Sequence, residues 1–106
     1  MSNESLVLIE RHDSGVAVVT LNSPKVNALS TELLSRLHTL AEELTAKPAG
    51  AVVLTGGERL FAAGADISQF GGPDEARTIG AAFHTALNAF AAIPSFTIAA
   101  VSGFAL

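Results

Sequence analysis

A leucine repeat between two short β-branched runs constrains the fold of this chain more than any other feature. Leucine recurs within residues 31–46 at spacings of four, three and four, which places the side chains on one face of an amphipathic helix. The flanking runs 16–22 and 50–57 are typical of strands. A strand, helix, strand order joins parallel strands by a right-handed crossover, so we expect an α/β fold with a largely parallel sheet. The helix stripe is Leu33, Leu37, Leu40 and Leu44.

A second apolar run precedes the first of these strands. Residues 6–11 and 16–22 are both rich in β-branched side chains, and the turn-forming cluster 12–15 separates them. This pattern predicts an antiparallel β-hairpin. Ser30 stands directly before the leucine helix, where a hydroxyl oxygen can accept a hydrogen bond from a free N–H of the first turn. We therefore predict that Ser30 is the N-cap.

The second half of the chain continues the alternation of strand and helix. The run GPDE at residues 72–75 is typical of a helix start, because proline fits the first turn and carboxylates face the positive end of the dipole. Pro94 ends this helix, and 96–101 reads as another buried strand. The strand at 50–57 lacks polar alternation, so we expect burial on both faces. The predicted apolar stripe of the second helix is Ile79, Phe83, Ala86, Leu87 and Phe90.

Composition limits the classes of partner. Hydrophobic residues make up 49% and charged residues 15% of a 106-residue chain, which is apolar for a small domain, so some of its surface is expected to face further chain or a partner. A net charge of −4 argues against nucleic acid and anionic membrane as partners. The start of the chain does not resemble a signal peptide, and we expect a cytoplasmic location.

The sequence gives little indication of a metal site or of a catalytic nucleophile. The chain has no cysteine, and His12, His38 and His84 show no metal-ligand spacing, so we predict no metal site. Neither a phosphate-binding glycine loop nor a nucleophile elbow is present.

The stretch FAAGADI at 61–67 offers a different kind of chemistry. It holds small residues around Gly64 and then one carboxylate, so a ligand bound there meets backbone N–H groups. Backbone N–H groups aimed at a developing negative charge form an oxyanion hole. The alternative interpretation is a tight connection in which Asp66 caps a short helix that begins at Ile67.

Three ordered segments together resemble the crotonase, or enoyl-CoA hydratase/isomerase, superfamily. They are VAVVTLNSPKVNALS at 16–30, AVVLTGGERLFAAGADISQF at 51–70 and IPSFTIAAVSGFAL at 93–106. The resemblance implies an α/β crotonase-like ββα spiral (ClpP/crotonase type), incomplete at the C-terminus. Residues 1–106 are then the N-terminal portion of a single crotonase-like domain. That portion stops just before the second oxyanion-hole glycines and the catalytic glutamates, which the family carries beyond the position of Leu106.

The same resemblance assigns site residues. The peptide N–H of Ala65, which follows the motif glycine, is expected to polarise a thioester carbonyl. Ser68 is often basic in relatives, so one contact to CoA is expected to be weaker here. The further substrate-binding positions that the resemblance implies are Lys25, Val26 and Ala28 beside the CoA channel, and Ala63, Asp66, Ile67 and Ser68 around the acyl thioester.

The expected activity is that of an enoyl-CoA hydratase, which adds water to 2-enoyl-CoA thioesters in fatty acid or related acyl-CoA metabolism. The 106-residue chain alone is predicted to be inactive. An isomerase, hydrolase or another enzyme of the superfamily is the first alternative, and a non-catalytic interaction fragment is the second. No separate cofactor is expected, because CoA is part of the substrate. The resemblance also implies a homotrimer or hexamer for the full-length protein.

Overall fold

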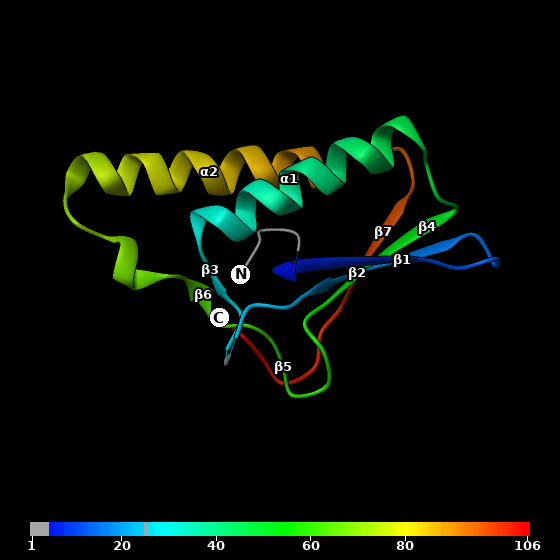
Figure 1. Ribbon diagram of the computed structural model, residues 1–106, viewed down its shortest axis with the longest axis horizontal. Coiled ribbons are helices and arrows are strands. Elements are labelled where there is room, and N and C mark those ends of the chain that lie inside the picture. The colour runs from blue at the N-terminus through cyan, green and yellow to red at the C-terminus, as the bar shows by residue number, and fades with distance from the viewer. Residues whose placement is uncertain (1–4, 25) are drawn as a thin grey trace.

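The computed structural model describes residues 5–24 and 26–106 (Figure 1). Its main sheet has four strands in the order β1-β2-β4-β7, with β1 antiparallel to β2 and the other pairs parallel. The hairpin and the crossover between parallel strands are therefore confirmed. The strands are β1 (Val7–Arg11), β2 (Val16–Leu21), β4 (Ala51–Thr55) and β7 (Phe96–Ala100).

Two helices lie side by side along one face of the sheet (Figure 1). Helix α1 (Thr31–Ala46) connects β2 to β4, and Ser30 caps it by accepting a hydrogen bond of 3.1 Å from Leu33 N, as predicted. Helix α2 (Pro73–Ala91) connects the central part of the chain to β7. Among the described residues, neither helix combines the length and the hydropathy that a bilayer crossing needs.

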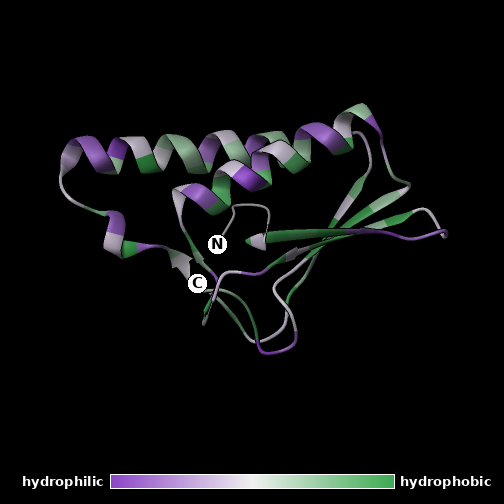
Figure 2. Ribbon diagram, in the orientation of Figure 1, coloured by the Kyte–Doolittle hydropathy of each residue, from purple (hydrophilic) through white to green (hydrophobic). Residues whose placement is uncertain are grey.

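The core lies between α1 and the sheet. Strand β2 buries every second residue, which is the alternation expected of a strand with one covered face. The leucine stripe of α1 packs against those side chains. Figure 2 shows hydrophobic residues along the strands, and hydrophilic residues at the β1–β2 turn and at the start of α2. The fully buried members with the largest side chains are Leu33, Leu34, Leu40, Leu44, Val7, Val19 and Val52.

Two short parallel pairs tie the loops together below the sheet. Strand β3 (Ala28–Leu29) pairs with β6 (Gly64–Ala65), and β5 (Leu60–Ala62) pairs with β8 (Phe104–Ala105). A single turn of 3₁₀ helix, η2 (Ile67–Gln69), follows β6. These pairs bring segments that are far apart in the sequence to one end of the molecule.

Burial differs from the sequence prediction in three places. The run predicted at 96–101 forms β7 over Phe96–Ala100, but β7 is exposed along its whole length; it is one of the two edge strands, and the described residues place no strand beyond it. The prediction that the strand at 50–57 is buried on both faces is wrong, because only Val52 of β4 is fully buried. In the stripe of α2, Leu87 is 46% exposed because it lies towards the exposed strand β7, whereas Ile79, Ala86 and Phe90 are buried.

Candidate functional site

The predicted CoA-side segment and the predicted oxyanion segment lie side by side. Strands β3 and β6 align Ala28 with Gly64 and Leu29 with Ala65. Just before this pair, Ala63 N donates to Val26 O at 3.0 Å. The structure therefore brings together four of the predicted positions, which are Val26, Ala28, Ala63 and Ala65. Lys25 lies outside the described residues.

The direction of the Ala65 N–H follows from the bonds on either side of it. Asp66 N donates to Leu29 O at 3.2 Å, so this N–H points towards β3. Successive peptide N–H groups of an extended strand point to opposite edges, as the alternating bonds of a parallel ladder require. The N–H of Ala65 consequently points away from β3, where it is available to a ligand rather than to the ladder.

Gly64 makes the turn that allows this arrangement. Its φ of +94° lies in the region that glycine enters without steric cost. The left-handed turn lets the N–H groups of both Ala63 and Asp66 face the 26–29 segment. A Cβ at Gly64 would also lie only 3.1 Å from the carbonyl oxygen of Leu106, so the end of β8 passes directly beside the motif.

The alternative interpretation of Asp66 is confirmed. Asp66 is the N-cap of η2, and its Oδ1 accepts hydrogen bonds from Ser68 N at 3.1 Å and from Ser68 Oγ at 2.6 Å. In this cap the side chains of Asp66 and Ser68 form a hydrogen bond with each other. It leaves the main chain of Ala65 unaffected, so capping and an oxyanion role are compatible. The side chain of Ile67 is 79% exposed and contributes an apolar surface next to the cap.

Asn27 is a residue of this region that the sequence interpretation missed. Its side chain is buried and forms hydrogen bonds with Ser23, Gly56 and Phe61. The available signal was an asparagine in a loop directly before a short apolar run, since asparagine enters left-handed turns more readily than other side chains.

Gln69 is the second missed residue, and it ties η2 to the start of α1. Its Oε1 accepts from Thr31 N at 3.0 Å, and its Nε2 donates to Glu32 Oε2 at 3.1 Å. A hydrogen bond from the backbone N–H of Glu32, together with the Gln69 amide, holds the pKa of the Glu32 carboxyl below its ordinary value. No sequence pattern marks Gln69, because its partners lie 37 and 38 residues away along the chain.

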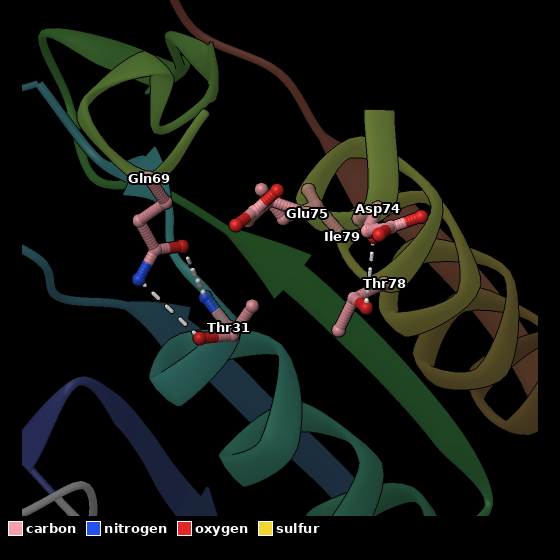
Figure 3. Close-up of a pocket in the computed structure, with 6 residues that line it drawn as sticks. All are labelled: Thr31, Gln69, Asp74, Glu75, Thr78 and Ile79. Atoms are coloured by element: carbon pink, nitrogen blue, oxygen red, sulfur yellow. Dashed lines mark hydrogen bonds between the residues drawn. The ribbon is translucent and has the colours of Figure 1, made fainter. Parts of the chain in front are cut away.

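A cavity of about 380 Å³ opens beside this tie, between the first turns of α1 and α2 (Figure 3). Two carboxylates border it, which makes it unsuited to the phosphates of CoA. It does not include Ala63 or Ala65, so it is separate from the candidate oxyanion segment. Its lining residues are Thr31, Gln69, Asp74, Glu75, Thr78 and Ile79. Within the described parts of the chain, no group of three or more His, Asp or Glu side chains is placed to hold a metal ion.

Comparison with known proteins agrees with this geometry. The profile of the enoyl-CoA hydratase/isomerase family matches residues 11–106. The chain is 39% identical over 102 residues to a probable enoyl-CoA hydratase, echA8, of Mycobacterium bovis, with 94% of this chain and 39% of that protein covered.

Solved structures show the same fold. DspI from Pseudomonas aeruginosa superposes with a TM-score of 0.89 at 30% identity, with 99% of this chain and 41% of that chain covered. An enoyl-CoA hydratase from Mycobacterium smegmatis superposes with a TM-score of 0.85 at 30% identity, with 92% of this chain and 40% of that chain covered. The chain thus spans about two fifths of the length of the relatives it matches. On this profile match and these superpositions, the chain belongs to the enoyl-CoA hydratase/isomerase family and has the crotonase fold.

Proposed function

We propose that the whole protein that carries this chain is an enoyl-CoA hydratase. In this reaction the oxygen of water bonds to the β-carbon of a 2-enoyl-CoA, and a proton is added to the α-carbon. Between these two steps the electron pair of the double bond is held as a thioester enolate, with negative charge on the carbonyl oxygen. A preorganised N–H donor aimed at that oxygen stabilises the enolate.

The main support for this proposal is the direction of the Ala65 N–H. It points away from β3 and lies in a segment of small residues that a thioester can approach closely. Leu106 N donates to Ala62 O at 3.0 Å, which holds the main chain after β8 next to the same segment. A second N–H donor supplied just after Leu106 in the whole protein would therefore lie near the N–H of Ala65. The acid and base for the proton transfers are proposed to come from glutamates later in that protein.

The remaining site positions are proposed substrate contacts. Val26 and Ala28, with Lys25 beside them, border the proposed CoA channel, and Ala63 lines the thioester pocket. Ile67 offers its exposed apolar side chain to the substrate. Asp66 and Ser68 are proposed to shape the pocket through their cap. A homotrimer or hexamer is a further proposal, and a light-scattering mass of the whole protein tests it.

A product assay on the whole protein tests the reaction. With crotonyl-CoA, a hydratase forms the 3-hydroxyacyl thioester, whereas a hydrolase releases free CoA. With a 3-enoyl thioester, an isomerase moves the double bond without adding water. Formation of free CoA or of an isomer in place of the hydroxyacyl product would refute the hydratase proposal.

A substitution at Ala65 tests whether its N–H is the oxyanion donor. Ala65→Pro removes the N–H donor, and kcat is expected to fall about 100- to 1000-fold, as on loss of one oxyanion donor elsewhere. Ala65→Gly keeps the N–H and serves as the matched control, with kcat close to wild type. Equal losses in both variants would show that packing at residue 65, rather than the donor, matters.

One observation favours a second candidate, in which the chain acts as a non-catalytic interaction module. The edge strand β7 exposes Phe96 by 81% and Ile98 by 52%, and an unpaired apolar edge is suited to pairing with another chain. Concentration-dependent association of the 106-residue chain without CoA binding would support this candidate. A monomeric, folded chain would count against it.

A further inference from the structure

Asn27 is the one polar residue that is buried among those the structure describes, with 6% of its surface exposed. Its Oδ1 accepts a hydrogen bond of 2.8 Å from Ser23 N, and its Nδ2 donates to Gly56 O at 3.1 Å and to Phe61 O at 3.2 Å. A backbone N–H can only donate and a carbonyl can only accept, so these partners determine the orientation of the side-chain amide. All three bonds are to main-chain atoms.

These bonds connect Asn27 to three segments of the chain that lie next to β3 and β6. Ser23 lies before β3, Gly56 directly follows β4, and Phe61 lies in β5, which leads into the oxyanion segment. Gly56 lies so close to β5 that a Cβ there would be 2.7 Å from the carbonyl oxygen of Leu60. The carbonyl groups of Gly56 and Phe61 both accept from the Asn27 amide, which joins the end of β4 to β5.

The backbone of Asn27 completes the connection. Its φ of +52° is the one positive value for a non-glycine residue in the described ranges. The left-handed conformation turns the side chain back towards the 56–61 loop while the main chain continues into β3. Strand β3 then pairs with β6 and so holds Ala65. Asn27 O also accepts a long bond of 3.4 Å from Ala63 N.

We propose that Asn27 is a positioning residue for the oxyanion segment. It touches no reacting atom; it sets the place and direction of the Ala65 N–H by holding β3, which pairs with β6, and β5, which precedes β6 in the chain. This inference rests on the proposed function only in naming Ala65 as the donor. A donor displaced by about an ångström costs on the order of 100-fold in rate, so loss of the Asn27 amide is expected to lower kcat strongly.

Two variants separate this role from general stability. Asn27→Gly removes all three side-chain bonds and keeps the positive φ without strain. Asn22→Ala is the matched control, because Asn22 is an exposed asparagine directly after β2 whose Nδ2 donates to Ser5 O at 2.8 Å. Asn27→Asp keeps the shape and the acceptor for Ser23 but sets a carboxylate oxygen against the carbonyl oxygens of Gly56 and Phe61, so it is expected to disturb the segment at least as much as Asn27→Gly.

Amide hydrogen exchange in the whole protein is the first measurement. In Asn27→Gly the N–H groups of Ala63 and Asp66, which donate to the 26–29 segment, are expected to exchange about tenfold faster, while those of the β2–β4 ladder keep their rates. Asn22→Ala is expected to leave Ala63 and Asp66 unchanged. Unchanged exchange at Ala63 in Asn27→Gly, or equal acceleration throughout the ladder, would overturn the proposal.

Kinetics of the whole protein with crotonyl-CoA is the second measurement. Asn27→Gly is expected to lower kcat about 10- to 100-fold with a smaller change in KM, and to return the carbonyl stretch of the bound thioester towards its free value. A wild-type kcat in this variant would overturn the positioning role. If the wild-type protein does not hydrate crotonyl-CoA, the hydratase proposal fails instead, and exchange at Ala63 and Asp66 still decides whether Asn27 holds the segment.

Discussion

Substitution of Gly56 by alanine tests how tightly the loop before the oxyanion segment is packed. The new Cβ would overlap Phe61 O and would lie 2.6 Å from Phe61 C and 2.7 Å from Leu60 O. Carbon atoms in favourable contact are about 3.5–4.0 Å apart, so the backbone must shift by roughly an ångström. All of the atoms in contact belong to the main chain, and no flexible side chain can move aside.

The cost has two parts. Overpacking of a tight site costs about 1–3 kcal/mol. The shift of Phe61 O also weakens its bond with Asn27 Nδ2, which adds about 1 kcal/mol. The free energy of unfolding is therefore expected to fall by about 2–4 kcal/mol in Gly56→Ala, out of about 5–15 kcal/mol for a typical native protein.

Urea denaturation monitored by circular dichroism measures this loss, and two other glycines calibrate it. Gly57 has a φ of +101° with no atom near its missing Cβ, so Gly57→Ala is expected to cost only backbone strain of about 1–2 kcal/mol. Gly80 lies within α2 with open space around it, so Gly80→Ala is expected to stabilise the chain by about 0.5–1 kcal/mol. A loss in Gly56→Ala no greater than that in Gly57→Ala would refute the reasoning.

Four further predictions concern the cap of α1, the Glu32 carboxyl, its partner Gln69 and turnover by the chain alone. Ser30→Ala removes the cap of α1 and should lower stability by about 1 kcal/mol in the same denaturation assay, whereas Ser30→Gly should cost less. The pKa of Glu32 is held below its ordinary value of 4.5, so its stabilising effect is complete above pH 4.5 and is lost as the pH falls through the lower folded value. Gln69→Ala should raise the pKa of Glu32 in a carboxyl-carbon NMR titration, and an unchanged pKa would argue against the bond between them. The 106-residue chain should give no turnover of crotonyl-CoA, because the Ala65 N–H is one donor without an acid or base; robust turnover would contradict the assignment.

The elements that could be predicted from the sequence are those with local signals. The helix at 31–46 has both a leucine repeat and a capping serine within one stretch, and the hairpin has two β-branched runs around a turn cluster. Such signals act within a few residues, so they do not depend on the rest of the fold. The site roles of Ala63, Ala65, Val26 and Ala28 came from the family resemblance, and the structure shows that the segments that hold these residues lie side by side.

The links that hold the site together have no such signal. Asn27 reaches partners 29 and 34 residues further along the chain. Strands β3 and β6 have two residues each, which is too short for any alternation of polar and apolar side chains to be read. Both features exist only because the main sheet brings the loops at its lower end together, so they could be found only in the folded structure.

The exposed strand β7 shows why a strand can be predicted correctly and its burial wrongly. An unbroken apolar run favours a strand wherever it lies, because β-branched and aromatic side chains fit the pleated backbone. Burial depends instead on which elements cover the strand, and in the described residues β7 has a neighbour only on the β4 side. The composition had already indicated this outcome, since a chain with 49% hydrophobic residues was expected to leave apolar surface for further chain or a partner. Much of that surface lies on β7, on β8 and at the residue after β8, where Phe96, Phe104 and Leu106 are 81%, 68% and 81% exposed. Leu106 N donates to Ala62 O, so this surface adjoins the candidate oxyanion segment, and a chain that covered β8 would also border the N–H that Ala65 is proposed to present.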